Sequence, residues 1–228
     1  MNIQGYQKLT LLDFPGKVAC TVFTGGCNLR CPFCHNGSLV RTPNAFDSAE
    51  TEVLAYLQKR KGLLDAVCIS GGEPLLQSDL RDFITAVKGM GYLVKLDTNG
   101  ALPERLLPLL ESGSLDYIAM DVKSSPAGYP KATGIQSDFA PFAKSIAAIR
   151  QSGIPHEFRT TVVKGIHEKQ DLAAIAELLG DELYFLQGFV DSGDLLGEGN
   201  AAFSKEEMQA LLDAVRAYTP RAALRGIQ

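Results

Sequence analysis

The sequence has no uninterrupted apolar run near the length that a membrane-spanning helix needs, which is about 20 residues. Its first residues, MNIQGYQKLTLLDFPGK, also lack the apolar core of a signal peptide. These two absences argue against a membrane protein and predict a cytoplasmic one.

A block of lysine and arginine is missing too. The chain has 22 Lys and Arg against 26 Asp and Glu, a formal net charge of −4. Because nucleic-acid surfaces usually carry a basic stripe, no nucleic-acid partner is expected. The 228 residues, 46% hydrophobic and 21% charged, fit one globular domain over residues 1–228.

Cysteines are present in an odd number, five, and three of them lie within eight residues: Cys27, Cys31 and Cys34. A secreted disulfide framework favours an even count spread along the chain. In a reducing compartment, a tight cluster indicates metal binding or catalysis instead. Cys20 and Cys68 lie in the apolar runs KVACTVF and DAVCIS, so they are expected to be small buried core residues.

Six short apolar runs alternate with helical patterns along the chain. The runs span residues 17–23, 65–70, 92–97, 116–121, 157–163 and 182–187. Near-continuous apolar strands are typical of a parallel sheet covered on both faces. Six βα units fall short of the eight that close a TIM barrel. The predicted fold is therefore α/β, a partial (βα)6 TIM-like barrel with parallel strands.

The helices between the runs show apolar residues at i, i+3, i+4 and i+7, as at Leu80, Phe83, Ile84 and Val87. Pro108 predicts that the helix over 102–110 is short or kinked. Capping boxes are expected at Asp47 with Glu50 and at Ser204 with Glu207; the second begins a C-terminal helix over about 204–217.

Polar groups follow each predicted strand at once. The cysteine loop, about residues 24–46, follows the first strand, and GGEP, DTNG, MDVK, RTTVVKG and LQGF accompany the later ones. Because the carboxyl ends of parallel strands share one face, we expect these groups to form one site. Asp97 and Asp121 would meet there and could hold a cation.

Three thiolates in this loop leave several metal centres open. Zinc would take a fourth protein ligand, such as His35, His156 or His167, or a water, but C-x3-C-x2-C lacks the second cysteine pair of the usual zinc motifs. An electron-transfer cluster would need four cysteines. A 4Fe-4S cluster held by three cysteines fits better, and it leaves one iron free to bind a small molecule.

The motif C-x3-C-x-aromatic-C, with Phe33 at the aromatic position, resembles the signature of the radical S-adenosylmethionine (SAM) enzymes. GGEP directly after the next strand strengthens the resemblance, and the partial barrel is also the fold of that family. The resemblance implies one 4Fe-4S cluster on Cys27, Cys31 and Cys34. It also implies SAM on the fourth iron, where one electron cleaves SAM to methionine and a 5′-deoxyadenosyl radical.

The resemblance also implies a SAM site. Backbone groups of Gly71, Gly72 and Glu73 would receive the SAM amino group, and Phe33 would lie beside the adenine. Lys123 would meet the carboxylate as a charged group. The other expected contacts are His35, next to the cluster, and Asp97, Thr98, Asn99, Asp121, Arg159 and Gln187. Two alternatives stay open: an ordinary ion pair of Arg159, and a salt bridge between Lys123 and Asp97.

The D-x-K of MDVK, together with CPFCHN and DFPGK, resembles the glycyl-radical-enzyme activating enzymes, most closely the group that activates anaerobic ribonucleoside-triphosphate reductase. That implies a protein substrate, whose backbone glycine loses a hydrogen, and a low-potential donor such as flavodoxin or ferredoxin. No acid or base residue is expected to be catalytic beyond the cluster and SAM.

Three alternatives remain. The first is a radical SAM enzyme that acts on a small molecule, and the second is an activating enzyme of another glycyl-radical enzyme, such as pyruvate formate-lyase. The third is a zinc-binding interaction module.

Overall fold

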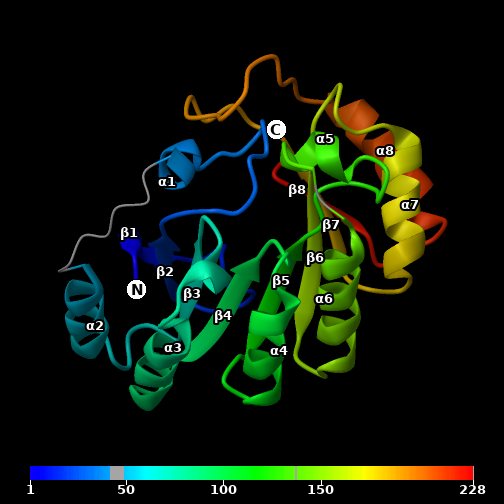
Figure 1. Ribbon diagram of the computed structural model, residues 1–228. Helices are drawn as coiled ribbons and strands as arrows, with labels where there is room; N and C mark the ends of the chain where they lie inside the picture. The colour runs from blue at the N-terminus through cyan, green and yellow to red at the C-terminus, as the bar shows by residue number, and fades with distance from the viewer. Residues whose placement is uncertain (42–48, 137, 228) are drawn as a thin grey trace.

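The computed structural model describes residues 1–41, 49–136 and 138–227, which include one curved sheet of eight strands (Figure 1). β1 (Ile3–Thr10) pairs antiparallel with β2 (Ala19–Thr24). Every later neighbouring pair is parallel, through β3 (Ala66–Gly71), β4 (Leu93–Thr98), β5 (Tyr117–Asp121), β6 (His156–Val162), β7 (Tyr184–Gly188) and β8 (Ala223–Arg225). The strand order follows the chain and leaves β1 and β8 as edges, so the barrel is open between them.

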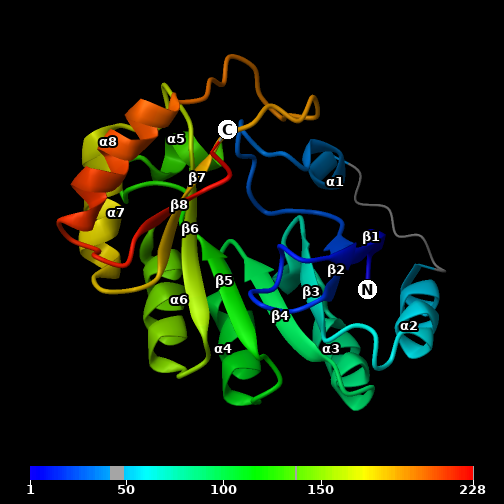
Figure 2. The ribbon, with the colours of Figure 1, turned by 180° about the vertical axis from the view of Figure 1, so that it is seen from behind.

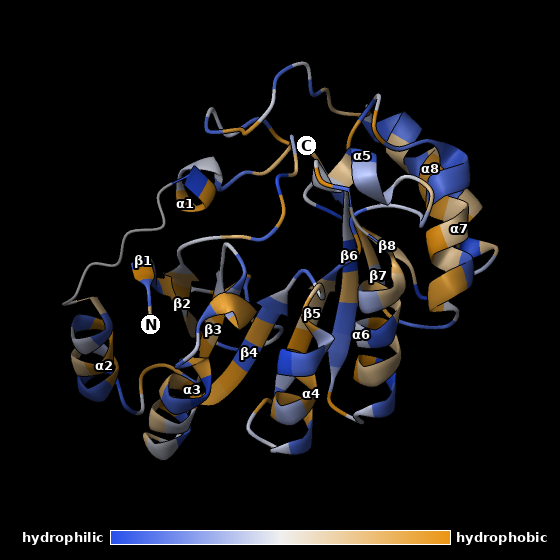
Figure 3. Ribbon diagram, in the orientation of Figure 1, coloured by the Kyte–Doolittle hydropathy of each residue, from blue (hydrophilic) through white to orange (hydrophobic). Residues whose placement is uncertain are grey.

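Helices connect the parallel strands and cover the outer face of the sheet (Figures 1 and 2). They are α2 (Ala49–Lys59), α3 (Leu80–Gly89), α4 (Pro103–Glu111), α6 (Ala140–Gln151), α7 (Lys169–Leu179) and α8 (Lys205–Arg216). Three short elements follow strand ends: α1 (Gly37–Arg41), η1 (Pro74–Leu76) and α5 (Tyr129–Thr133). Figure 3 shows hydrophilic and hydrophobic bands on the covering helices, and the predicted apolar stripe of α3 is buried.

The six predicted strands appear as β2 to β7, which confirms the fold class, but β1 and β8 were not predicted. β1 carries no apolar pattern because only Ile3 and Thr10, its two ends, are fully buried. β8 has three residues, too few for a periodicity. The parallel part of the sheet therefore has seven strands instead of six.

Local details of the helices also agree with the sequence. α4 is nine residues long and contains Pro108. The box at Ser204 and Glu207 caps α8, whereas Asp47 of the other predicted box and residues 42–46 of the predicted cysteine loop lie outside the described residues. Cys20 and Cys68 are fully buried, as expected. Among the described helices, none has the length and apolar character to cross a bilayer.

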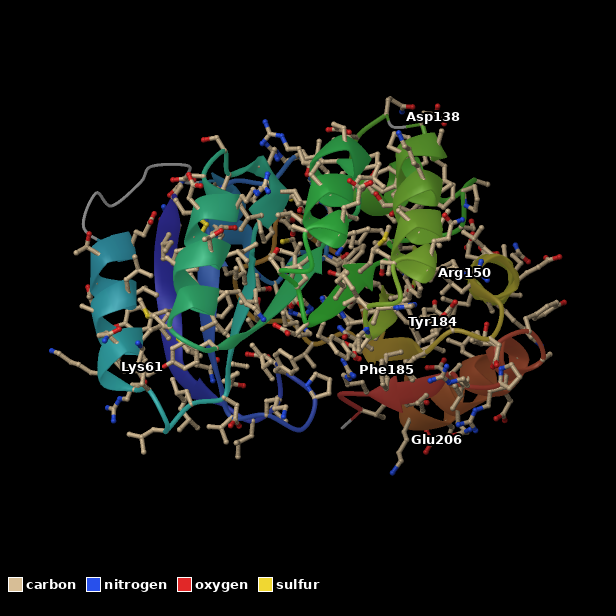
Figure 4. The ribbon with its side chains drawn as sticks, turned by 90° about the horizontal axis from the view of Figure 1, so that it is seen from below. Lys61, Asp138, Arg150, Tyr184, Phe185 and Glu206 are labelled. Atoms are coloured by element: carbon tan, nitrogen blue, oxygen red, sulfur yellow. The ribbon has the colours of Figure 1, made fainter. Side chains whose placement is uncertain are left out.

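The inside of the barrel is polar. Strand register places Asp97, Ala119 and Glu157 in one row and Asp121, Arg159 and Phe185 in another. Phe185 and its neighbour Tyr184 are labelled in Figure 4, which looks along the barrel from below. Because side chains alternate along a strand, the side chains of Tyr184 and Phe185 lie on opposite faces of β7.

The amino ends of the strands are closed by an aromatic residue. Phe14, in the loop after β1, packs with Ala19 and Ala66, and its ring centroid lies 5.7 Å from that of Tyr117. Asp13 accepts a hydrogen bond from the Thr21 hydroxyl and fixes the same loop. The barrel is therefore filled at the amino ends of its strands and accessible at their carboxyl ends.

Candidate functional site

A cavity of about 260 Å³ lies at the carboxyl ends of the strands. All the site residues expected from the sequence line it except Glu73, namely Cys27, Cys31, Phe33, Cys34, His35, Gly71, Gly72, Asp97, Thr98, Asn99, Asp121, Lys123, Arg159 and Gln187. Because the carboxyl ends of the parallel strands share one edge, residues up to 160 positions apart in the chain, from Cys27 to Gln187, line the same cavity.

Five further lining residues were not predicted: Leu29, Asn36, Val40, Ser70 and Thr161. Ser70 and Thr161 could have been found, since each lies at a strand end and on the face that its strand turns to the barrel interior. Asn36 carried no such signal, because it depends on how the cysteine loop folds back. Its amide donates to the Gly71 carbonyl at 3.2 Å.

The three cysteines of the loop are free thiols in one cavity wall. Burial raises the pKa of the Cys31 thiol to about 12 and also raises the pKa of Cys27. Such thiols become thiolates when a metal replaces the proton. Donors already face Cys27: the Leu29 N–H lies 3.4 Å from its Sγ atom and the Asn99 amide 3.8 Å.

Three thiols in one cavity wall are a ligand set that a zinc ion and an iron-sulfur cluster would use differently. A zinc ion needs its ligands at about 2.0–2.3 Å from one point, whereas each cysteine of an iron-sulfur cluster binds a different iron. Three thiols around a cavity that is open to a further ligand therefore fit a cluster with one iron left free.

Two late segments hold the cysteine loop. The first is residues 190–200, here called the strap, which passes over α1 at the top of Figure 1. From the strap, Gly197 N–H and the Asn200 amide donate to the Pro32 carbonyl at 2.8 and 3.1 Å. The second segment is α5, whose Thr133 carbonyl accepts from Arg30 N–H at 2.8 Å.

Asp194 of the strap holds the beginning of α1. Its carbonyl accepts from Gly37 N–H at 3.1 Å, and its carboxylate accepts from Ser38 N–H at 2.7 Å and pairs with Arg41. The cysteine loop is thus fixed on both sides of its last cysteine.

The Gly-Gly-Glu stretch packs against the start of the cysteine loop. Gly71 has a φ of +114°, which favours glycine, and Gly72 and Glu73 donate their N–H groups to Thr24 and Gly26 carbonyls, each at 2.9 Å. A Cβ atom on Gly72 would overlap the Gly26 carbonyl group. Only glycine permits this close approach.

Glu73 is fully buried and does not line the cavity. Its carboxylate accepts from Leu75 N–H at 3.0 Å, the Thr98 hydroxyl at 2.8 Å and Asn99 N–H at 2.7 Å. Burial raises the pKa of Glu73 to about 7, against the effect of these donors. Its side chain therefore joins the ends of β3 and β4 and takes no part in the cavity wall.

Five charged side chains form a network on the opposite wall. Arg159 Nε lies 2.8 Å from Asp121 Oδ1, and its Nη1 lies 3.4 Å from Asp97 Oδ2. Lys123 Nζ lies 3.0 Å from Asp121 Oδ2, and Lys95 pairs with Asp97. The ion pair that was left open as an alternative for Arg159 is therefore present. The alternative ion pair of Lys123 with Asp97 was wrong, because Lys123 pairs with Asp121 instead.

The network keeps its charges at neutral pH. Burial would raise the pKa of Asp121, but Arg159 and Lys123 outweigh it and hold that pKa below its usual range. Burial would lower the pKa of Lys123, but the Asp121 carboxylate outweighs it and raises that pKa, so the amine stays protonated. Because three cations already neutralise Asp97 and Asp121, the suggested cation site between these two carboxylates is filled by the protein's own side chains.

Aromatic contacts complete the walls. The Phe33 ring is buried edge-on to His167, with centroids 5.9 Å apart, and the His35 ring lies 5.6 Å from that of Phe189. Gln187, one residue before the end of β7, lies opposite Thr161. Thiols, a protonated amine, amides and an aromatic edge thus surround one cavity, a donor set that suits an iron-sulfur cluster beside a charged organic ligand.

Comparison with known proteins gives a consistent result. The sequence model described as Radical SAM superfamily matches residues 21–179. A Methanocaldococcus jannaschii protein named "Putative glycyl-radical enzyme activating enzyme MJ1227" is 32% identical over 193 residues, which cover 82% of this chain and 79% of that protein.

Two other proteins are similar to this chain over a smaller part of their own length. A Pyrobaculum aerophilum protein named "Probable GTP 3′,8-cyclase" is 29% identical over 168 residues, covering 71% of this chain but 54% of that protein. Among solved structures, a radical SAM methyltransferase from Sphaerobacter thermophilus superposes with a TM-score of 0.71 at 16% identity, over 96% of this chain and 68% of its own. This chain therefore spans about half the length of the GTP cyclase and shares the fold of the methyltransferase.

Proposed function

The chain belongs to the radical SAM superfamily, and we propose that within it the protein is an activating enzyme that removes a hydrogen atom from a backbone glycine of a partner enzyme. Its cofactors are one 4Fe-4S cluster and SAM, as in the rest of the superfamily. The cluster supplies the electron that converts SAM into a hydrogen-abstracting radical.

We assign the cluster to Cys27, Cys31 and Cys34. The N–H of Leu29 and the amide of Asn99 already point at Cys27 Sγ, and such donors stabilise a thiolate. The strap holds the loop through the Pro32 carbonyl, and the Phe33 side chain is buried between the last two cysteines.

We assign the carboxylate of SAM to Lys123, whose amine is held in its charged form and lines the cavity beside the cysteines. Asp97 and Asp121 are bound to Arg159, so their main task is to orient that guanidinium and Lys123. The Gly71 and Gly72 backbone, Thr98, Asn99, His35 and Gln187 complete the proposed SAM contacts.

The observation that carries the substrate assignment is the 32% identity to the Methanocaldococcus jannaschii protein named "Putative glycyl-radical enzyme activating enzyme MJ1227", over about four fifths of both chains. The D-x-K pair, Asp121 and Lys123, and the DFPGK loop support it. For the partner we propose anaerobic ribonucleotide reductase, with a low-potential flavodoxin or ferredoxin as electron donor. The alternative partner is another glycyl-radical enzyme, such as pyruvate formate-lyase.

A second candidate function is radical chemistry on a small molecule. The similarity to a GTP 3′,8-cyclase supports it, although this chain matches only 54% of that protein. The two candidates differ in what stimulates SAM turnover: a protein with a reactive glycine, or a metabolite alone.

The deciding experiment is anaerobic incubation of reduced, reconstituted protein and SAM with candidate glycyl-radical enzymes. We expect a glycyl doublet in the EPR spectrum of the partner together with 5′-deoxyadenosine. Cys34→Ala should abolish both, while Cys20→Ala, a core cysteine, should retain them. SAM cleavage that responds to a metabolite and never to a protein would refute the activating-enzyme proposal.

A further inference from the structure

The backbone at Lys123 is held by side chains after the sheet has ended. β5 ends at Asp121, opposite Arg159 of β6, and Lys123 lies two residues further on. A residue just beyond a strand has lost the ladder that would fix its backbone. Here four buried side chains replace that ladder.

These side chains come from different parts of the fold. The Val122 carbonyl accepts from the Thr160 hydroxyl at 2.6 Å, and that hydroxyl accepts in turn from Tyr184 at 2.8 Å. On the next residue, Lys123 N–H donates to the Tyr129 hydroxyl at 3.4 Å. The Lys123 carbonyl accepts from His167 Nε2 at 2.7 Å.

His167 makes the shortest bond to Lys123 and is fixed itself. Its Nδ1 accepts from Val163 N–H at 3.1 Å, so the ring proton must lie on Nε2, where it can be donated to the Lys123 carbonyl. The side chain is 2% exposed. Burial lowers its pKa, which keeps the ring in this neutral form.

The same ring also contacts the cysteine loop, through the edge of Phe33. Phe33 lies between Cys31 and Cys34, and its side chain is 3% exposed. One imidazole therefore contacts both walls of the cavity: the loop assigned to the cluster and the backbone of the lysine assigned to the SAM carboxylate.

We propose that His167 is a positioning residue that holds the Lys123 amine at a fixed place relative to the cysteine loop, through its bond to the Lys123 carbonyl and its contact with Phe33. Lysine has a long flexible side chain, so the position of its amine depends on a fixed backbone. The inference rests on the proposed SAM contact of Lys123 but requires no particular partner protein.

Two variants separate the two contacts. His167→Gln retains an amide that can donate to the Lys123 carbonyl, whereas His167→Phe retains a ring against Phe33 and loses the donor. His156→Phe is the matched control, because His156 also bonds a backbone carbonyl, that of Ile154 at 2.7 Å, but lies at the amino end of β6.

The measurements are SAM affinity by anaerobic equilibrium dialysis, iron content, and the change that SAM causes in the EPR spectrum of the reduced cluster. For His167→Phe we expect about four irons per chain, SAM affinity weaker by about tenfold or more, and a reduced spectral change. His167→Gln should stay within about threefold of wild type, and His156→Phe should match wild type.

A double-mutant cycle with Lys123→Met tests whether His167 acts through the lysine. If it does, His167→Phe should cost SAM affinity in the wild-type background and almost nothing when Lys123 is already methionine. Equal losses in both backgrounds, or unchanged affinity in His167→Phe, would overturn the proposal. Should His167→Phe not fold, Thr160→Val removes the donor to Val122 and enters the same cycle with the same expectations.

SAM binding is measured without any partner enzyme. If the wild-type protein produced no glycyl radical on any candidate partner, the proposed function would be refuted and this inference would stand. If the partner gained a normal glycyl radical but the loss of SAM affinity were equal in both backgrounds of the cycle, this inference would be refuted and the proposed function would stand.

Discussion

Replacing Gly72 with alanine would test whether the end of β3 and the start of the cysteine loop act as one rigid unit. An added Cβ atom would overlap the Gly26 carbonyl oxygen and would lie 2.7 Å from the carbonyl carbon. Both are backbone atoms, so neither can rotate away as a flexible side chain could. The loop as a whole has to move.

The size of that movement follows from the geometry. Ordinary contact begins at 3.4 Å, so the carbonyl carbon must retreat by at least 0.7 Å, from 3.4 minus 2.7, and the nearer oxygen requires more. The shift would stretch the 2.9 Å bond from Glu73 N–H to Gly26 and displace Cys27, the next residue. Overpacking of this kind costs about 1–3 kcal/mol of stability.

We therefore expect Gly72→Ala to lower the melting temperature by about 2–12 °C. Because a displacement of about 1 Å can reduce the function of a site by roughly 10²-fold, SAM affinity should fall on that scale. Thermal denaturation, iron content after anaerobic reconstitution and equilibrium dialysis with SAM measure the three effects.

Gly89→Ala is the matched control. Gly89 ends α3, and no atom lies within 4 Å of a Cβ atom added there. Alanine favours a helix over glycine by up to about 1 kcal/mol, so this variant should be as stable as wild type or more so. A Gly72→Ala protein with unchanged melting temperature, iron content and SAM affinity would show that the reasoning about the close approach is wrong.

Three further predictions concern single side chains. Lys123→Met should keep about four irons but weaken SAM binding by roughly 10–100-fold in equilibrium dialysis, because a charge-assisted bond is lost. Lys59 is exposed at the end of α2, so the control variant Lys59→Met should bind SAM as wild type does. Equal SAM affinities of the two variants would exclude the Lys123 contact. Burial lowers the pKa of His167 in the folded chain. The contribution of the neutral ring to the free energy of unfolding is therefore fully present above the unfolded pKa of about 6.5, and it is lost as the pH falls below that value. Urea denaturation of the metal-free chain should thus show a smaller loss between roughly pH 7.5 and 5.5 for His167→Gln than for wild type, and an equal loss would contradict this. Pro108→Ala should raise the free energy of unfolding by up to about 3 kcal/mol in urea, since Pro108 is exposed within α4 and cannot donate to the preceding turn; a lower midpoint would speak against it.

The sequence was sufficient to predict most of the residues that share the cavity, since strand direction alone decides at which edge a strand ends. Cys27, Asp97, Asp121 and Lys123 were placed together in this way. The partner of Lys123 could not be predicted, because two carboxylates end neighbouring strands and the choice between them depends on strand twist and side-chain reach.

The ion pairs inside the barrel also could not be predicted from the sequence. Lys95 stands within an apolar run, yet it is 1% exposed and pairs with Asp97 two residues later. Glu157 is equally buried and accepts two bonds from Arg225 of β8, a strand too short to predict. Such pairs become visible only when the register of neighbouring strands is known.

The anchoring of the cysteine loop has a consequence for the order in which the protein matures. The strap that holds Pro32 and Gly37 lies at residues 190–200, so it is synthesised well after the cysteine loop. Because a domain generally folds as a unit, the three thiols lack this support until the strap has left the ribosome. A delivery system that acted on the loop before the strap was synthesised would meet it before its final shape exists.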